Sequence, residues 1–374
     1  MERYLKQQVF DDLKRKMVFI GGPRQVGKTT FSRQLYPAKQ VSYYNWDISE
    51  HQSLILAKEF TSSRLLIFDE IHKFRKWRNY LKGLYDGIKA GSFADREILV
   101  TGSARLDLYR FGGDSLQGRY HYLRLMPLSF AEIRGKTLKD LETLLHLTGF
   151  PEPFLGQSED QARRWSREYR VRLVREDLRD LEAVKEVDSI LLLINRLPDC
   201  IGSPLSIESL RGDLSAAHKT VSRWLDILER IYGMFRLLPM GGPKIRSVKK
   251  ERKAYLFDWS TIKEVGPKFE NLVAVHLLKY VYWNEDKSGR DLELRYFRDT
   301  DGREVDFVVT ENSKPILFVE CKASEGEISP HLKYLAAKYP KVPAYQIYLH
   351  GHKDFQTPQG IRHCPATVFL KDLV

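Results

Sequence analysis

MVFIGGPRQVGKTT, residues 17–30, places an apolar run directly before the pattern G-x-x-x-x-G-K-[ST]. Between a strand and a helix, this pattern forms a loop whose backbone N–H groups face phosphate oxygens. Gly22 and Gly27 let the backbone curl around the phosphates, and Lys28 reaches the β and γ oxygens as a point charge. Thr29 is expected to bind Mg²⁺ through its hydroxyl group. The loop therefore predicts a nucleotide site that takes ATP and Mg²⁺.

The residues around this loop alternate short apolar runs with helical stretches. A helix is expected to begin near Thr30, and Thr30 is itself one of the predicted nucleotide-binding residues. The apolar runs are MVFI at 17–20, VSYYNW at 41–46, LLIF at 65–68 and ILV at 98–100. This rhythm is typical of a parallel sheet covered by helices. We predict an α/β domain of the P-loop NTPase fold over residues 1–135.

A second motif follows the loop by about forty residues, where the apolar strand at 65–68 ends in Asp69 and Glu70. Asp69 is predicted to hold the magnesium ion, directly or through water. Glu70 is predicted to polarise the attacking water, because phosphoryl transfer depends on positioning and charge stabilisation. The alternative is a strand that ends in a surface turn.

The run EILVTGSA at 97–104 ends in small hydroxyl residues. Thr101 or Ser103 is expected to lie between the two carboxylates and to sense the γ-phosphate. A turn of small residues that takes no part in the chemistry is the alternative, and it stays open.

Four segments together resemble one family: GPRQVGKTT, LLIFDEIHK, ILVTGSA and GRYHYLRLMPLSFAEI. They resemble the bacterial and archaeal AAA-type ATPases that carry a C-terminal domain of restriction-endonuclease-like kind, and the similarity covers most of the chain. The resemblance implies an AAA+ ATPase. Asp47 also falls on a family position, at the end of the second strand, without a clear chemical role.

Arg119 lies where the family has a Gly-Arg pair ahead of its PLSF segment. The resemblance implies that Arg119 contacts a γ-phosphate, including one across a subunit boundary. Such an arginine stabilises transition-state charge and favours a homo-oligomer, such as a ring. A structural salt bridge is the equally weighted alternative for Arg119.

Residues 136–243 are expected to form a helical lid and a winged-helix-like region, with few strand signals. The charged helix at 161–183 is interpreted as the lid. A helix-turn-helix is predicted over 206–238, with a second helix that buries its apolar side chains. The polar side chains left for DNA contact are those of His218, Lys219, Ser222 and Arg223. A pure scaffold role for this helix stays open.

The charge balance favours a polyanionic partner. Lys and Arg exceed Asp and Glu by 12, and the sequence pI is about 9.4. A basic run of Lys244, Arg246, Lys249, Lys250, Arg252 and Lys253 adds to this signal. We therefore expect DNA, including branched or structured DNA, as the partner.

Three further features of the sequence bear on location. No apolar run reaches the roughly 18 residues that a membrane span requires, and MERYLKQQVFDD lacks the apolar core of a secretory signal. The three cysteines, Cys200, Cys321 and Cys364, are too widely separated for a disulfide framework or a zinc site. A cytoplasmic protein with reduced thiols, away from membranes, is expected.

Residues 244–374 carry a second constellation of charged residues on expected strands. Asp306 interrupts one apolar strand, and the next ends in Glu320-Cys321-Lys322. Alternation places Glu320 and Lys322 on the same face. If Asp306 lies beside them, the oxygens suit Mg²⁺ or Mn²⁺, and Lys322 is placed to activate water or stabilise phosphodiester charge.

This region resembles the PD-(D/E)xK nucleases, and Glu270 fits the additional acidic residue that many of them carry on the preceding helix. The resemblance implies a small α/β domain with Glu270, Asp306 and Glu320 as metal ligands and with deoxyribonuclease activity. A domain that binds nucleic acid without cutting it is the alternative.

Two functions follow from these features. The first is an ATPase that acts on DNA and is coupled to a metal-dependent nuclease. The second is an ATP-dependent regulatory switch, or a DNA-binding or remodelling protein, without nuclease activity. A metabolic kinase is disfavoured because the accessory regions show no motif for a small-molecule acceptor.

Overall fold

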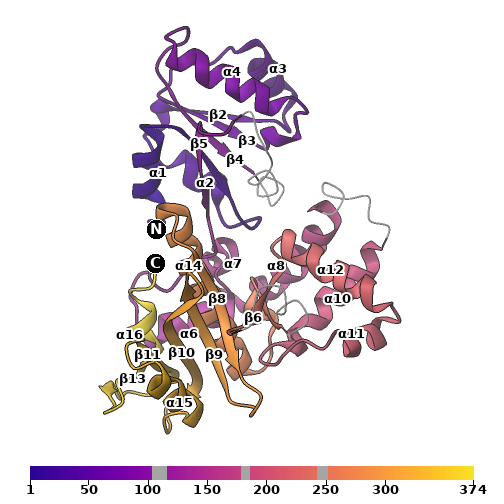
Figure 1. The fold of residues 1–374 in the computed structure, drawn as a ribbon. Coiled ribbons are helices and arrows are strands. Elements are labelled where there is room, and N and C mark those ends of the chain that lie inside the picture. Colours follow the sequence, from indigo (N-terminus) through magenta and orange to yellow (C-terminus); the bar gives the residue numbers. More distant parts are fainter. Residues whose placement is uncertain (103–115, 178–185, 242–251) are drawn as a thin grey trace. The chain divides into compact units, whose positions relative to one another are not determined.

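The computed structural model describes residues 1–102, 116–177, 186–241 and 252–374. The chain divides into two compact units (Figure 1). The N-terminal unit is Glu2–Pro127, and the C-terminal unit is Leu128–Val374 together with Met1. The predicted boundary at 135/136 therefore differs from this division by about eight residues.

The N-terminal unit is built on a five-stranded sheet in which neighbouring strands are parallel. Its order is β2 (Val41–Asn45), β3 (Leu65–Asp69), β4 (Glu97–Thr101), β1 (Met17–Gly21) and β5 (Tyr120–Arg124). The four predicted strands are confirmed as β1 to β4. Because the strands are parallel, the loops after β1, β3 and β4 meet at the same edge of the sheet.

Helices bury the faces of this sheet. They are α1 (Lys6–Leu13), α2 (Lys28–Arg33), α3 (Ser49–Ala57) and α4 (Trp77–Lys89), with short 3₁₀ turns at Ala38–Gln40 and Ile71–Lys73. Every residue of β1 and β3 is buried, as expected for a parallel sheet covered on both sides. On α4, Trp77, Leu81, Leu84 and Ile88 form the apolar stripe that enters the core.

The C-terminal unit begins with a helical part. Its helices are α6 (Leu138–Leu147), α7 (Pro151–Gly156), α8 (Glu159–Arg172) with a π-turn at Leu173–Asp177, α10 (Val187–Arg196), α11 (Ile207–Leu214) and α12 (His218–Arg230). The predicted lid helix corresponds to α8, and its last residues lie outside the described part of the chain. The aromatic rings of Trp165 and Tyr169 stack on each other, and both contact Phe150. This contact ties α8 to the start of α7.

The region that we expect to be mostly helical, residues 136–243, has one strand among its described residues, near its end. The predicted second helix ends at Arg230, and the chain turns through Tyr232, whose φ is 60°, into β6 (Met234–Pro239). β6 pairs with β7 (Lys253–Leu256) in antiparallel fashion and with β8 (Leu292–Arg298) in parallel fashion. A short apolar run after a helix has no periodicity that separates strand from helix. The predicted boundary at 243/244 therefore divides two strands of one sheet.

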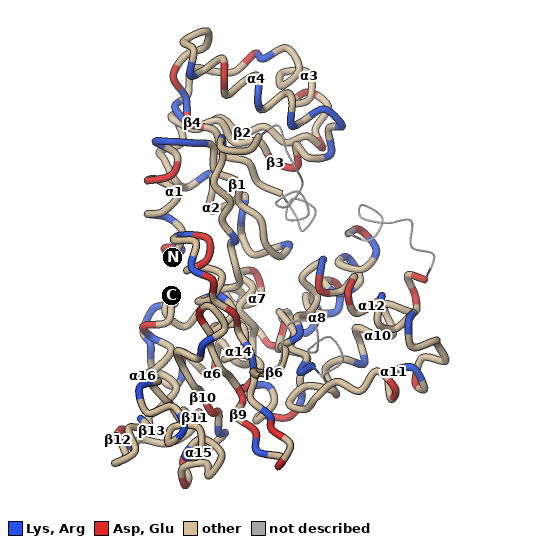
Figure 2. The backbone as a smooth tube through the Cα atoms, in the orientation of Figure 1, with Lys and Arg blue, Asp and Glu red and all other residues tan. Residues whose placement is uncertain are grey.

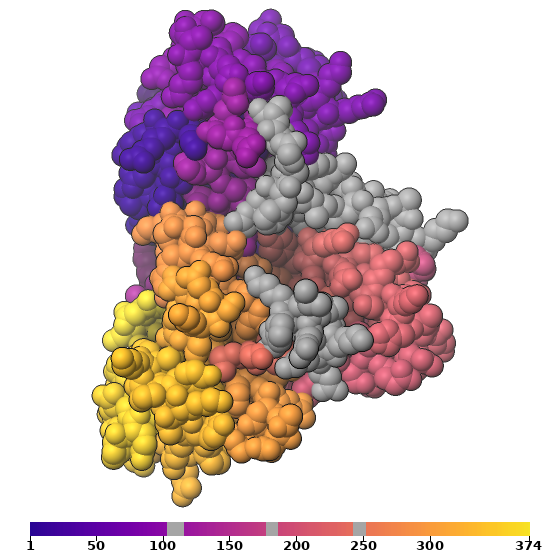
Figure 3. Space-filling view, in the orientation of Figure 1, coloured from indigo at the N-terminus to yellow at the C-terminus, as the bar shows by residue number. Residues whose placement is uncertain are grey.

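This larger sheet has eight strands, in the order β12-β13-β11-β10-β9-β8-β6-β7. Its remaining strands are β9 (Glu304–Glu311), β10 (Lys314–Ser324), β11 (Ala344–His350), β12 (Phe355–Gln356) and β13 (Ile361–Pro365). The unit also contains the helices α15 (Pro330–Lys338) and α16 (Ala366–Leu370). Two 3₁₀ turns lie at Leu197–Cys200 and at Trp259–Thr261. In the space-filling view the orange-to-yellow residues form one continuous body (Figure 3). β9 and β10 are neighbouring antiparallel strands, so residues on either side of the turn between them lie side by side.

The long helix α14 (Val265–Ser288) lies against β7, β8, β9 and β10. Its buried side chains include Phe269, Leu272 and Val275. Among the described residues, no helix combines the length and apolar character needed to cross a bilayer.

Candidate active sites

The loop after β1 has the backbone geometry that its glycines predict. Gly22 has a φ of 114°, and a Cβ there would clash with the carbonyl oxygen of Leu125. Gly27 has a φ of 87° and precedes α2. Both conformations disfavour any residue with a side chain. Lys28 Nζ donates to the carbonyl oxygens of Gly22 (3.0 Å) and Pro23 (2.6 Å), so the ammonium lies within the curl of the loop.

Asp69, at the end of β3, accepts hydrogen bonds from three hydroxyl groups. Thr29 Oγ1 lies 2.9 Å from Asp69 Oδ2, and Thr101 Oγ1 lies 2.6 Å from Asp69 Oδ1. The third donor is Tyr43 Oη on β2, at 2.6 Å. Burial and the neighbouring carboxylate raise the pKa of Tyr43, so the phenol keeps its proton. Tyr43 was not among the predicted site residues, because its contact with Asp69 depends on β2 lying beside β3.

Glu70 follows Asp69 with an unusual backbone. Its φ is 57°, a left-handed conformation that is uncommon for residues other than glycine and is frequent at functional sites. Burial raises the pKa of the Glu70 carboxyl group. Glu70 Oε2 lies 3.5 Å from Lys73 Nζ and 3.6 Å from His72 Nε2. Lys73 Nζ also pairs with Asp47 Oδ2 at 2.6 Å, which connects Asp47 to this site.

Thr101 contacts both acidic residues, since its hydroxyl donates to Asp69 while its carbonyl accepts the N–H of Glu70 at 3.0 Å. The alternative residue, Ser103, lies outside the described residues. Thr30 is exposed in the first turn of α2. Thr101 therefore contacts the carboxylate of Asp69 and the backbone of Glu70, and its role at a γ-phosphate stays a prediction.

Arg119 lies at the opposite edge of the same sheet. It precedes β5, whose first residue Tyr120 is in register with Met17 at the start of β1. The length of β1, at about 3.3 Å per residue, separates Arg119 from the loop that follows Gly21. Arg119 Nε and Nη2 donate to Asp86 at 2.7 and 3.0 Å. Within one chain Arg119 therefore forms a salt bridge with Asp86, and its contact with a γ-phosphate stays a prediction.

The second helix of the predicted helix-turn-helix has the expected faces. Val221, Leu225 and Leu228 are buried, while His218 and Lys219 are exposed. Ser222 is half-buried, and Arg223 is exposed but pairs with Glu186 at 2.9 Å. Figure 2 shows that acidic residues are interspersed with basic ones along α10, α11 and α12. This surface is therefore mixed in charge.

The C-terminal unit brings the predicted nuclease-like residues together. Glu270 lies on α14, Asp306 on β9, and Glu320 and Lys322 on β10. Lys322 Nζ lies 2.7 Å from Glu320 Oε1, so these two side chains share a face. Asp306 Oδ2 accepts the N–H of Cys321 at 2.9 Å, and Glu320 Oε2 accepts that of Asp306 at 3.4 Å.

A buried lysine lies among these carboxylates. Lys253 begins β7, and its side chain is 1% exposed. Its ammonium lies 2.6 Å from Glu304 Oε1, 3.2 Å from Glu270 Oε1 and 3.5 Å from Asp306 Oδ1. The expectation that Lys253 belongs to an exposed basic run is therefore wrong. Of that run, Lys244, Arg246, Lys249 and Lys250 lie outside the described residues.

We call Glu270, Glu304, Asp306 and Glu320, with Lys253 and Lys322, the carboxylate cluster. Burial, and then the charge of Asp306, raise the pKa of Glu270 and of Glu320 to about 7. Within the described ranges, no group of three or more His, Cys, Asp or Glu side chains is arranged to hold a metal ion. The metal-ligand roles of Glu270, Asp306 and Glu320 remain predictions.

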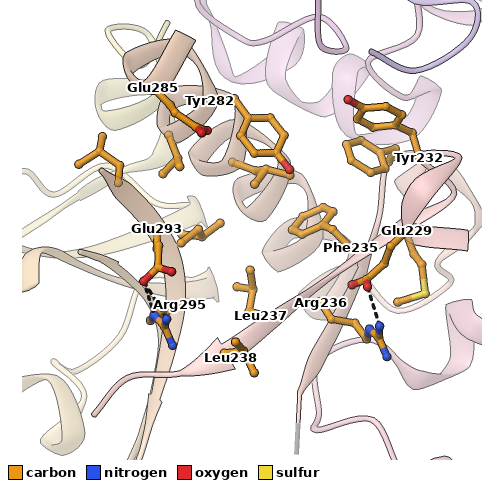
Figure 4. A pocket seen from close by; sticks show the side chains of 16 residues that line it. Glu229, Tyr232, Phe235, Arg236, Leu237, Leu238, Tyr282, Glu285, Glu293 and Arg295 are labelled. Atoms are coloured by element: carbon orange, nitrogen blue, oxygen red, sulfur yellow. Dashed lines mark hydrogen bonds and ion pairs between the residues drawn. The ribbon is translucent and has the colours of Figure 1, made fainter. Parts of the chain in front are cut away.

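A separate pocket of about 310 Å³ opens between β6, α12, α14 and β8 (Figure 4). In its wall Arg236 pairs with Glu229 and with Asp226, and Arg295 pairs with Glu293. None of the predicted site residues lines this pocket.

Three family profiles match consecutive parts of the chain. Residues 14–134 match a family described as "AAA domain". Residues 138–265 and 265–369 match two families described as domains of unknown function, DUF8612 and DUF4143.

Whole-length relatives are distant. The uncharacterized protein MJ1544 of Methanocaldococcus jannaschii is 23% identical over 357 residues, which cover 85% of this chain and 77% of the relative. The uncharacterized protein Rv2008c of Mycobacterium tuberculosis is 23% identical over 375 residues, with coverages of 90% and 82%.

Two solved structures are similar at low identity. The Walker-type ATPase PABY2304 of Pyrococcus abyssi has a TM-score of 0.42 at 13% identity, over 69% of this chain and 93% of that one. The ORC1 protein of Aeropyrum pernix, in complex with DNA, has a TM-score of 0.36 at 12% identity, over 73% and 93%. The profile match over 14–134, together with the parallel sheet and the loop after β1, identifies the N-terminal unit as an AAA-type P-loop ATPase domain.

Proposed function

We propose that this protein hydrolyses ATP in its N-terminal unit and that the bound nucleotide controls how tightly the C-terminal unit binds DNA. The observation that carries the ATPase half is the position of Thr101, which contacts both Asp69 and Glu70 beside the loop that holds Lys28 and Thr29.

The residues at this edge fit an ATP-bound magnesium ion. Thr29 and Asp69 offer a hydroxyl and a carboxylate oxygen within 2.9 Å of each other, and oxygen is the ligand that Mg²⁺ prefers. When bound, Mg²⁺ neutralises charge that develops on the phosphates. Lys28 supplies a further positive charge, and Thr101 and Tyr43 fix the Asp69 carboxylate in one orientation.

Glu70 is the residue that we assign to the attacking water. Its backbone is left-handed, and burial raises the pKa of its carboxyl group, which favours proton acceptance. Lys73, 3.5 Å away, keeps the charged form accessible. Proton acceptance and water orientation by Glu70 are the steps that this chain contributes to hydrolysis.

The DNA half of the proposal is supported by charge and by element order. The chain has a net charge of +12, which favours polyanions. In the C-terminal unit α10, α11 and α12 precede the antiparallel pair β6–β7, which is the order of a winged helix. We assign DNA contact to His218, Lys219, Ser222 and Arg223.

Arg119 supports assembly into an oligomer. It lies at the sheet edge away from its own loop, so the nucleotide it is able to reach belongs to a neighbouring chain. In that arrangement Arg119 would leave Asp86 and stabilise transition-state charge. We therefore propose a homo-oligomer in which hydrolysis depends on the neighbour.

Metal-dependent cleavage of DNA is the second candidate. It is favoured by the gathering of Glu270, Asp306, Glu320 and Lys322 in one cluster. It is disfavoured by Lys253, because a buried ammonium contacts two of the three carboxylates that would ligate the metal. The proposal therefore assigns binding rather than cleavage to the C-terminal unit.

The first test measures ATP turnover and DNA affinity on the same preparations. Lys28→Ala and Glu70→Gln are each expected to lower the turnover by at least about a hundredfold, since each removes a group that acts on the phosphates or the water. Lys219→Ala combined with Arg223→Ala is expected to weaken the binding of fluorescent DNA and to reduce its salt dependence. Lys333→Ala, an exposed lysine on α15, is the matched control.

A panel of linear, single-stranded, forked and four-way DNA, incubated with Mg²⁺ or Mn²⁺, separates the two candidates. We expect ATP-dependent binding and no cleavage. Cleavage that disappears in Asp306→Ala and in Lys322→Ala would overturn this assignment in favour of the nuclease. ATP turnover without any DNA binding would contradict the DNA half alone.

A further inference from the structure

The carboxylate cluster already contains a cation of its own. Lys253 Nζ lies within 3.5 Å of carboxylate oxygens from Glu270, Glu304 and Asp306, which belong to α14 and β9. A lysine is long enough to adopt other positions at a surface, but this one is 1% exposed. Its ammonium therefore occupies the position between α14 and β9 in which a bridging metal ion would lie.

The backbone that carries Lys253 is held on two sides. Lys253 is in register with Leu237 of β6, and it also forms a bridge with Pro204. Leu205 donates its N–H to the carbonyl oxygen of Arg252 at 2.8 Å. The ammonium also lies 5.8 Å from the ring centre of Tyr296. The backbone that carries Lys253 is therefore fixed by β6 and by the segment around Pro204.

The oxygens of the predicted ligands are already engaged by protein donors. Glu270 Oε1 accepts from Lys253 and from Tyr255 Oη, the latter at 2.7 Å. Asp306 Oδ1 faces Lys253, while Oδ2 accepts from Cys321 N. Glu320 Oε1 accepts from Lys322 and Oε2 from the backbone of Asp306. Five of the six oxygens thus have a donor in the fold.

A divalent ion does not fit this arrangement. It would have to approach a buried ammonium that its ligands also contact, and like charges repel strongly where water is scarce.

We propose that Lys253 is a built-in cation that replaces the divalent metal ion in this cluster, so that the C-terminal unit assembles its carboxylates without metal. This inference does not depend on the ATPase or DNA roles proposed above. It predicts that removing the ammonium of Lys253 is sufficient to convert the cluster into a metal site, and that no further ligand has to be added.

The experiment measures Mn²⁺ binding to the full chain without nucleotide, by electron paramagnetic resonance of free Mn²⁺ and by titration calorimetry. Wild type is expected to show no saturable site in the C-terminal unit. Lys253→Met, which keeps the length and packing of the stem, is expected to gain a site that Asp306→Asn removes. Lys322→Met is the matched control, because it also deletes a lysine of the cluster but one that is 44% exposed and pairs with Glu320 alone.

Two results would overturn the proposal. One is a Mn²⁺ site in wild type that Asp306→Asn abolishes. The other is equal gain of Mn²⁺ binding in Lys253→Met and Lys322→Met, which would mean that any loss of positive charge is sufficient. If Lys253→Met fails to fold, wild type still provides a test through its thermal unfolding. The proposal expects the same unfolding temperature with Mn²⁺ and with a chelator, whereas a native metal site in the folded state would raise it with Mn²⁺.

Discussion

Thr101 Oγ1 donates a 2.6 Å hydrogen bond to Asp69 Oδ1 across neighbouring parallel strands, in a position that is fully buried. The two residues are in register at the ends of β4 and β3. The carbonyl oxygen of the same threonine accepts the N–H of Glu70, so Thr101 contacts the predicted magnesium ligand and the backbone of the predicted catalytic residue.

Thr101→Val keeps the shape of the side chain and removes its donor. Asp69 then loses one of three hydroxyl partners and gains orientational freedom, so we expect ATP turnover to fall by about tenfold or more. Steady-state phosphate release measures this. Thr143→Val provides the control, at a half-buried threonine on α6 whose hydroxyl donates to the carbonyl oxygen of Lys139 on the same helix. An unchanged rate of ATP turnover in Thr101→Val would mean that the hydroxyl groups of Thr29 and Tyr43 are sufficient to position Asp69.

Mixing two inactive variants tests whether Arg119 acts on a neighbouring chain. Arg119→Ala keeps an intact loop, while Lys28→Ala keeps an intact arginine. If Arg119 reaches across a subunit boundary, a mixture should recover part of the ATP turnover that each variant lacks, because some interfaces combine an intact loop with an intact arginine. No recovery in mixtures that demonstrably form hetero-oligomers would contradict action across the boundary. Asp86→Ala, which frees Arg119 from its salt bridge, is expected to retain turnover.

The buried ion pair of Lys279 and Glu132 is expected to matter for stability. Both side chains are almost fully buried, and Lys279 Nζ also donates to Ser129 Oγ at 3.0 Å. Glu132→Gln leaves a buried ammonium without its counter-charge, and we expect a loss of about 3 kcal/mol in the free energy of unfolding. Urea denaturation measures it. Replacing the pair with Glu132→Leu and Lys279→Met should restore much of this loss; a double variant no more stable than Glu132→Gln would contradict the explanation.

His276 makes the C-terminal unit sensitive to acid. Its Nε2 accepts the N–H of Phe130 at 2.8 Å, its Nδ1 contacts the carbonyl oxygen of Leu272 at 2.8 Å, and burial lowers its pKa to about 4. Between about pH 6.5 and pH 4, His276 therefore binds a proton in the unfolded chain but not in the folded chain. The contribution of this group to stability falls by at most about 1.4 kcal/mol per pH unit as the pH decreases through that window.

The pH dependence is best measured as the difference between wild type and His276→Gln, whose amide retains a donor and an acceptor. Glu270 and Glu320 act in the opposite direction, because their raised pKa values favour the folded state at low pH and lose this effect as the pH rises toward 7. Taking the difference cancels their contribution. If the free energy of unfolding changes with pH in the same way in both proteins, His276 does not cause the predicted pH dependence.

Features that depend on neighbouring residues could be predicted from the sequence. The loop at 22–29, the strand that ends in Asp69 and the alternation of Glu320 and Lys322 follow from neighbouring residues, since backbone freedom and strand periodicity are local properties. The strand β6 was not predicted, because its six residues, which include Arg236, have no periodicity that separates a strand from a helix.

What the sequence by itself determined was the nucleotide-binding loop, the βα rhythm of the first domain and the presence of acidic residues on two later strands. Only the tertiary structure decided which side chains meet. The order of strands in each sheet brings Tyr43 to Asp69, sets Arg119 at the edge away from its own loop and buries Lys253 among carboxylates. Burial and pairing arise from segments far apart in the chain, so a lysine in a basic run looks the same in sequence whether water or carboxylates surround its ammonium.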